Sequence, residues 1–265
     1  MSDLADPSIR MVIDLGNSRL KWGLAGRDGS IPGAVATPTD DPAAWSAALQ
    51  QLDPKGQAHA WAVSSVNPPV AERLADFLRQ QGADDVQWFR SAADVPIRNR
   101  LEHAETAGAD RALAVLAAVP RAPSNRPGQV VSCGTAITVE RIDRDGLWLG
   151  GAIAPGLALV AGALQRGTAQ LPMVTIDEGA SPPPPSGPST ASAMAAGIFW
   201  GTLGAIRELV QRGSEGPDSW RIWTGGDASW LAPQLDGPQA WIVPDLVLLG
   251  LARAAFGASG ESETR

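Results

Sequence analysis

The sequence has little of what disulfide-bonded, metal-clustered or membrane-spanning proteins need. Its one cysteine, Cys133, excludes an internal disulfide and a thiolate metal cluster, and fits a reducing cytoplasm. The two histidines, His59 and His103, have no spaced partners and do not indicate a metal site. No run of about 18 apolar residues occurs, and residues 1–10 lack the basic start and apolar core of an export signal. We therefore expect a cytoplasmic protein that does not enter a membrane.

Positive charge is also scarce. The chain has 21 Lys and Arg against 28 Asp and Glu, a formal net charge of −7. This balance disfavours a general electrostatic attraction to nucleic acid or to anionic lipid. An anionic ligand therefore needs a local device, such as a glycine turn or a helix N-terminus.

Apolar residues, in contrast, are plentiful enough for a folded core. They make up 44% of the 265 residues, and charged residues make up 18%. A chain of this length predicts one large domain or two ordinary ones.

One local pattern occurs twice. Residues 11–25 read as a strand, a tight turn at 16–18 and a second strand, and residues 130–140 repeat this order around Gly134 and Thr135. In this alignment Asp14 corresponds to Ser132. One such turn alone indicates only a β-hairpin. Two in register, with a third glycine turn at 224–226, favour a nucleotide held between two lobes.

The rest of the chain alternates predicted helices and strands, which is typical of an α/β fold. The predicted lobes cover residues 1–120 and 121–265. The sequence predicts helices at 41–52, 68–82, 156–166, 189–212 and 245–256, strands at 59–66, 86–89 and 220–224, a helix starting near 107–109, and a stiff proline-rich loop at 181–188.

Seven short motifs resemble those of one family, in the same order. They are DLGNSRLKWG, AGADRA, SCGTAIT, GGAIAPGL, TAQLP, TGG and DLVLLGL, and the resemblance runs from about Met11 to Ala254. This set resembles the type III pantothenate kinases, within the superfamily of acetate and sugar kinases, heat-shock ATPases and actin. The resemblance implies a duplicated ribonuclease-H-like (actin-like ATPase) α/β fold, with a mixed five-stranded sheet flanked by helices in each lobe.

The same resemblance implies an activity and its partners. Members phosphorylate pantothenate to 4'-phosphopantothenate with ATP, the first step of coenzyme A synthesis. They are typically homodimers, and they need a divalent cation such as Mg²⁺ and a monovalent cation, K⁺ or NH4⁺.

The first turn carries the groups that phosphate binding needs. Glycine lets backbone N–H groups approach phosphate oxygens, and Lys21 adds a point charge. Asp14 offers the hard oxygen that Mg²⁺ prefers, through water, or else it only caps the turn. The predicted ATP-binding residues are Asp14, Leu15, Gly16, Asn17, Ser18, Arg19, Leu20, Lys21 and Thr135.

An Asp–Arg pair at a predicted helix start marks the acceptor site. An acidic residue in a first turn often only complements the helix dipole. The resemblance instead implies that Asp110 is the general base, and that Arg111 and Gly108 bind pantothenate, with the guanidinium on its carboxylate. The predicted substrate-binding residues are Leu101, Gly108, Ala109, Asp110, Arg111 and Thr190, the last of which also fits the N-terminus of a helix.

Two positions depart from the family pattern. Ser132 replaces an aspartate associated with the monovalent cation, and Leu101 replaces a substrate-contacting tyrosine. A serine hydroxyl can coordinate a cation but cannot offset its charge, so Asp14, Asp110 and Glu140 are left to hold cations. Three readings stay open: a kinase with altered cation dependence, a nucleotide-binding regulatory relative with weak or no activity, or a kinase for a different small hydroxyl substrate.

Overall fold

The computed structural model describes residues 9–176 and 181–257. The expectation that the chain has no export signal rests partly on residues 1–8, which lie outside the described residues. The chain divides into two compact units. Unit 1 comprises the chain up to Ile97, residues Leu101–Arg121 and the chain from Asp245 onward. Unit 2 comprises Arg98–Arg100 and Ala122–Pro244. The break near residue 121 lies close to the predicted lobe boundary. The predicted second lobe, 121–265, nevertheless included the C-terminal helix, whose contacts place it in unit 1.

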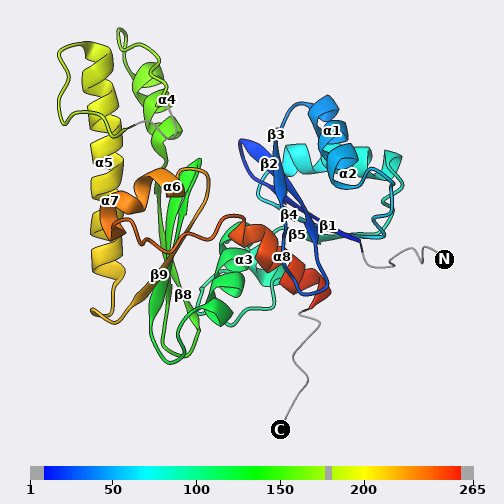
Figure 1. Cartoon of the computed structure of the whole chain (residues 1–265). Helices are drawn as coiled ribbons and strands as arrows, with labels where there is room; N and C mark the ends of the chain where they lie inside the picture. Colours follow the sequence, from blue (N-terminus) through cyan, green and yellow to red (C-terminus); the bar gives the residue numbers. More distant parts are fainter. Residues whose placement is uncertain (1–8, 177–180, 258–265) are drawn as a thin grey trace. The chain divides into compact units, whose positions relative to one another are not determined.

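Unit 1 is built on a mixed five-stranded sheet (Figure 1). The strand order is β3-β2-β1-β4-β5; β1 pairs antiparallel with β2 and parallel with β4. The central strands are short apolar runs, as expected for strands covered on both faces. The bounds are β1 Arg10–Leu15, β2 Arg19–Ala25, β3 Ala34–Pro38, β4 Ala60–Ser65 and β5 Val86–Phe89.

Helices α1 (Pro42–Leu52) and α2 (Pro68–Gln80) cover one face of this sheet (Figure 1). Each begins with a side-chain cap followed by proline: Asp41 accepts hydrogen bonds from the first turn of α1, and Asn67 does the same for α2. Phe77 packs edge-on against Trp22 and Trp45 inside this layer.

Helices α3 (Ala109–Ala118) and α8 (Leu246–Phe256) pack against each other on the opposite face. A Cβ on Gly250 would lie 2.0 Å from the carbonyl oxygen of Leu113, so only glycine permits so close a crossing. Leu248 of α8 reaches the sheet beside Val12 and Gly23. These contacts explain why a helix from the end of the chain belongs to the first unit. Two short 3₁₀ turns, Ala92–Asp94 and Val119–Arg121, flank α3 in the chain.

Unit 2 has a mixed sheet of four strands in the order β8-β7-β6-β9, one fewer than predicted. An isolated parallel bridge joins Trp223 to Ile242 where a fifth strand would lie. Pro238 and Pro244 enclose that segment, and proline ends a strand because it has no N–H to donate. The bounds are β6 Gly128–Cys133, β7 Ala136–Ile142, β8 Trp148–Pro155, β9 Trp220–Thr224, α4 Leu157–Gly167, α5 Thr190–Gly213, α6 Ala228–Leu231 and α7 Pro233–Asp236.

The long helix α5 supplies much of the core of unit 2. Phe199 and Ile206 are fully or almost fully buried in a cluster with Trp223 and Val131. By length and composition, α5 is the one helix in the described ranges that is apolar enough to cross a membrane. A buried core helix passes the same test, and the residues of α5 that are buried in this cluster account for part of its apolar composition.

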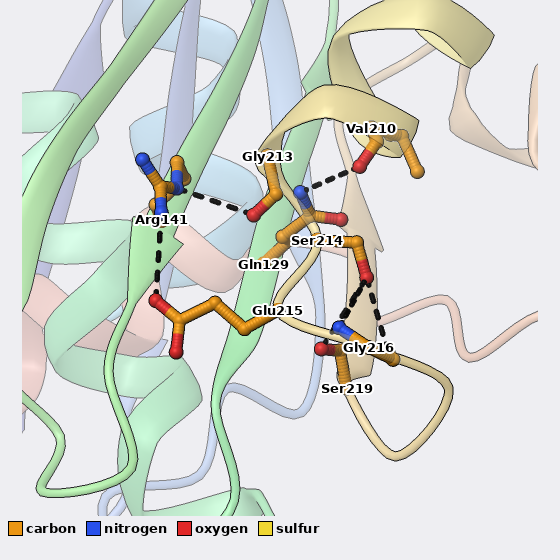
Figure 2. A network of polar contacts seen from close by, with 8 residues as sticks. All are labelled: Gln129, Arg141, Val210, Gly213, Ser214, Glu215, Gly216 and Ser219. Atoms are coloured by element: carbon orange, nitrogen blue, oxygen red, sulfur yellow. Dashed lines mark hydrogen bonds and ion pairs between the residues drawn. The ribbon is translucent and has the colours of Figure 1, made fainter.

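A polar network holds the C-terminal end of α5 (Figure 2). The Arg141 guanidinium donates to the carbonyl oxygen of Gly213 at 3.2 Å, and the Gln129 amide donates to that of Val210 at 3.0 Å. The last carbonyl groups of a helix have no hydrogen-bond partner inside the helix. Here side chains from β6 and β7 donate hydrogen bonds to two of these carbonyls. Arg141 also lies 3.4 Å from the carboxylate of Glu215.

Candidate active site in unit 1 and the second glycine turn

Three polar side chains form a row across neighbouring strands of unit 1. Asp14 near the end of β1 stands opposite Lys21 of β2 and opposite Ser64 of β4. The Ser64 hydroxyl donates a hydrogen bond of 3.0 Å to Oδ1 of Asp14. Because side chains alternate along a strand, Asp14 shares a face with Val12, the face that α8 covers.

The helices on that face bring two further carboxylates. Asp110 lies in the first turn of α3, and Asp245 immediately precedes α8. The Lys21 ammonium lies 2.9 Å from Oδ1 of Asp245. Asp14 and Asp110, two of the predicted site residues in unit 1, are also close enough to interact electrostatically.

The charge state of Asp14 reflects these surroundings. Its pKa is raised from 3.8 to about 7, mainly because burial penalises the charged carboxylate, and next because of the charge on Asp110. The hydrogen bond from Ser64 and the charge of Lys21 lower this pKa, and Asp245 raises it slightly. A carboxylate with a strongly raised pKa is a frequent mark of a functional site.

Gly108 shapes the position of the predicted base. It precedes α3 in an extended conformation, and a Cβ there would lie 2.4 Å from Oδ1 of Asp110 and 3.2 Å from Val66. The same oxygen of Asp110 accepts a hydrogen bond from the backbone N–H of Arg111 at 2.9 Å. The missing side chain at Gly108 thus leaves the space that the Asp110 carboxylate occupies.

A cavity of about 670 Å³ lies beside Gly108. Ser65, the last residue of β4, and Val66, which follows it, line the cavity together with residues of α2 and Arg90. The Arg90 guanidinium stacks on the Trp88 ring, 5.2 Å from its centroid. The cavity offers a small ligand both polar and apolar walls within reach of the start of α3.

The second glycine turn follows β6 in unit 2. The backbone N–H of Gly134 bonds to the carbonyl of Ala136, and two glycines pack against this turn. A Cβ on Gly156 would lie 2.0 Å from the carbonyl oxygen of Gly134, and one on Gly225 would lie 2.1 Å from that of Cys133. Gly225 also has a φ of +94°, which other residues rarely adopt. Burial raises the pKa of the Cys133 thiol, so it is an unreactive core residue.

Ser132 occupies the place in unit 2 that Asp14 occupies in unit 1. Each is the fifth residue of the first strand of its unit. Ser132 stands opposite Thr138 of β7 and Thr224 of β9, so this row consists of hydroxyl groups. Asp227, which is buried, follows Thr224 and the Gly225 turn in the chain. Its backbone N–H donates a hydrogen bond to the carbonyl oxygen of Cys133.

The remaining predicted residues fall into two groups. Leu15, Leu20 and Ala109 are fully buried, so they support the site from the core and do not offer an exposed surface to a ligand. The rest are half-buried or exposed. The half-buried residues are Gly16, Leu101, Arg111 and Thr135, and the exposed ones are Asn17, Ser18, Arg19 and Thr190.

Glu140, which the sequence left as a candidate cation ligand, is instead a buried partner of Trp148. Its Oε2 accepts a hydrogen bond of 2.9 Å from the indole N–H. This bond gives the carboxylate a structural role.

Two residues of the unit 1 cluster were not predicted, Ser64 and Asp245. Ser64 and Ser65 close the otherwise apolar strand β4, and polar residues at the end of a buried strand are a signal that could have found Ser64. Asp245 opens the DLVLLGL motif, but nothing in its local sequence shows that it faces Lys21.

The donor set of this cluster fits a magnesium ion shared with phosphate oxygens. Within residues 9–176 and 181–257, no group of three or more His, Cys, Asp and Glu side chains is arranged to hold a metal ion alone. Mg²⁺ in nucleotide enzymes commonly binds one or two carboxylates, waters and the phosphates themselves. Asp14 and Asp110 supply such carboxylates.

A duplicated α/β fold, with a glycine hairpin opening each unit and the carboxylate of Asp14 near the end of the first strand of unit 1, defines a ribonuclease-H-like (actin-like ATPase) architecture. Two solved structures share this fold: a Baf family protein from Campylobacter jejuni (TM-score 0.55, 20% identity, 92% of this chain and 96% of that one) and a 2-hydroxyisocaproyl-CoA dehydratase activator from Clostridium difficile (TM-score 0.54, 14% identity, 94% of both chains).

Sequence comparison defines the family. A family model of type III pantothenate kinase matches residues 10–212. A type III pantothenate kinase from Herminiimonas arsenicoxydans is 32% identical over 260 residues, covering 93% of this chain and 97% of its own. One from Chromobacterium violaceum is 37% identical over 258 residues, covering 93% and 99%. The chain belongs to the type III pantothenate kinase family and is a kinase.

Proposed function

We propose that this protein transfers the γ-phosphate of ATP to the primary hydroxyl of pantothenate, giving 4'-phosphopantothenate, the first step of coenzyme A synthesis. One observation carries the proposal: Asp110 and Lys21 lie close to Asp14, which is near the end of β1. The chain that holds this cluster belongs to the type III pantothenate kinase family. Phosphoryl transfer needs positioned reactants and stabilised charge rather than complex covalent chemistry, and this cluster offers both.

The first hairpin binds the ATP phosphates in this proposal. The exposed Asn17, Ser18 and Arg19 and the N–H groups of the turn face the phosphates, and Lys21 adds a positive charge. Leu15 and Leu20 are buried on either side of the turn and support it from the core. Asp14 would hold Mg²⁺ through water, and the bound ion would supply positive charge to neutralise the phosphates. Thr135 of unit 2 is assigned to ATP by family resemblance.

Asp110 acts as the general base for the acceptor. A carboxylate oxygen of Asp110 takes the proton of the attacking hydroxyl, and the proton later leaves to solvent. Arg111 receives the pantothenate carboxylate, and Gly108 and Leu101 form part of the wall, with the buried Ala109 supporting them from the core. Thr190, at the start of α5, is assigned to the acceptor by family resemblance.

The monovalent cation, K⁺ or NH4⁺, is assigned to the hydroxyl row at Ser132. Ser132, Thr138 and Thr224 offer neutral oxygens that can coordinate such an ion. The carboxylate of the family pattern is missing from this row. We therefore expect weaker dependence on the monovalent cation than an aspartate would give.

We also propose a homodimer that works in the cytoplasm without nucleic acid or membrane. The exposed side of α5 supports the dimer. Gly197, Gly201 and Gly204 lie along it with open space around each Cβ position, and Trp200 is 37% exposed beside them. Small residues on a helix let a second helix approach closely.

A direct assay tests the function. Purified protein with ATP, Mg²⁺ and a potassium or ammonium salt should form ADP only when pantothenate is added, and Asp110→Asn should abolish turnover while ATP still binds. ATP binding without turnover, across a series of cations, would instead identify a regulatory relative. Turnover only with another alcohol would reject pantothenate as the acceptor.

A further inference from the structure

Asp245 is unusual for a residue that precedes a helix. An aspartate at this position normally accepts hydrogen bonds from backbone N–H groups of the first helical turn. Asp245 makes no such bond to α8. Its backbone also has a φ of +56°, in the left-handed region that favours glycine and that costs an aspartate free energy.

The carboxylate is directed at Lys21 instead. Oδ1 of Asp245 lies 2.9 Å from the Lys21 ammonium, although the two residues are 224 positions apart in the chain. Both side chains are about one-third exposed or less, at 32% and 26%. A surface pair of this kind contributes little stability, so stability alone does not explain an aspartate in a costly conformation.

Asp14 is a second carboxylate near Lys21, and the ion pair of Lys21 is not with it. Lys21 stands directly opposite Asp14 on the neighbouring strand, yet its ammonium pairs with Asp245. An ammonium bound to Asp14 would neutralise the carboxylate next to Asp110. The pair with Asp245 directs the Lys21 ammonium away from an ion pair with Asp14, although its charge still lowers the pKa of Asp14.

The helix that follows Asp245 is closely packed. Helix α8 crosses α3 at the contact between Gly250 and Leu113, and α3 carries Asp110 in its first turn. Asp245, which holds Lys21, immediately precedes α8, and Asp110, the predicted base, lies at the start of α3. These two helices pack closely at one crossing. A lysine side chain has about 2 kcal/mol of rotamer entropy, and a fixed partner restricts it before a ligand binds.

We propose that Asp245 is a positioning residue that holds the Lys21 ammonium ready for the phosphates of ATP and prevents it from pairing with Asp14. This inference rests on the proposed role of Lys21 in ATP binding. It adds a function for Asp245 to the site.

A double-mutant cycle tests the coupling. ATP affinity is measured by calorimetry without pantothenate for the wild type, Asp245→Asn, Lys21→Met and the double variant. We expect Asp245→Asn to weaken ATP binding about tenfold in the wild-type background and less than about twofold in the Lys21→Met background. An equal loss in both backgrounds would overturn the proposal, because it would show a general structural effect.

Kinetics and a backbone control separate positioning from folding. Asp245→Asn should raise KM for ATP and leave KM for pantothenate unchanged. Asp245→Gly relieves the left-handed backbone and should show the same loss of ATP affinity; recovery of wild-type affinity in this variant would contradict the role of the carboxylate. Asp236→Asn removes an ion pair of similar exposure in unit 2, with Arg221, and serves as the stability control.

The outcomes distinguish this inference from the proposed reaction. Coupling in the ATP-binding cycle, with no pantothenate turnover by the wild type, would reject the acceptor and retain the role of Asp245. Pantothenate turnover with no coupling would reject the role of Asp245 alone.

Discussion

Replacing Asp14 by Asn should stabilise the protein while removing its activity. The pKa of Asp14 is about 7 in the folded protein against 3.8 for an ordinary aspartate. The folded protein therefore keeps a proton that the unfolded chain releases between pH 4 and 7, and stability falls as the pH rises through that window. At 1.36 kcal/mol per pH unit, the cost reaches a ceiling of about 4 kcal/mol at pH 8 and about 1.6 kcal/mol at pH 5.

An asparagine keeps the shape and can still accept the Ser64 hydrogen bond, but it carries no charge. Because the Asp14 side chain is only partly buried and water reaches it, we expect a gain of about 1–3 kcal/mol at pH 8 and less than half of that at pH 5. Thermal unfolding with EDTA at both pH values measures the gain, with the exposed Asp84→Asn as control. An Asp14→Asn variant no more stable than wild type at pH 8, or equally stabilised at both pH values, would refute the reasoning.

Three further predictions concern other parts of the chain. Gly108→Ala should reduce kcat by about 10- to 100-fold, because its Cβ displaces the Asp110 carboxylate; steady-state kinetics should show no such loss for Gly33→Ala, where a Cβ meets open space. Ser132→Asp should lower the K⁺ concentration for half-activation several-fold by restoring a charge; an unchanged K⁺ titration would remove Ser132 from the cation site. Gly201→Glu should shift a dimer toward monomer in sedimentation, because it places a charge on the small-residue face of α5; an unchanged dimer would locate the interface elsewhere.

Local patterns were sufficient to predict most elements. Alternating apolar residues around a glycine turn predicted the β1–β2 and β6–β7 hairpins, because strand periodicity and turn chemistry depend only on neighbouring residues. Proline and cap residues set the starts of α1 and α2 in the same way. The short strand β3 and the four-residue helices α6 and α7 carried no such pattern and were not predicted.

By itself, the sequence determined the two hairpins, the family and the candidate residues Asp14 and Asp110. Only the tertiary structure decided what surrounds them. Ser64 and Asp245 reach the cluster across 50 and 224 residues of chain, through parallel strand pairing and through the packing of α8 on α3. Strand and helix periodicity specify which face a side chain takes, whereas the partner on that face depends on which distant element packs there.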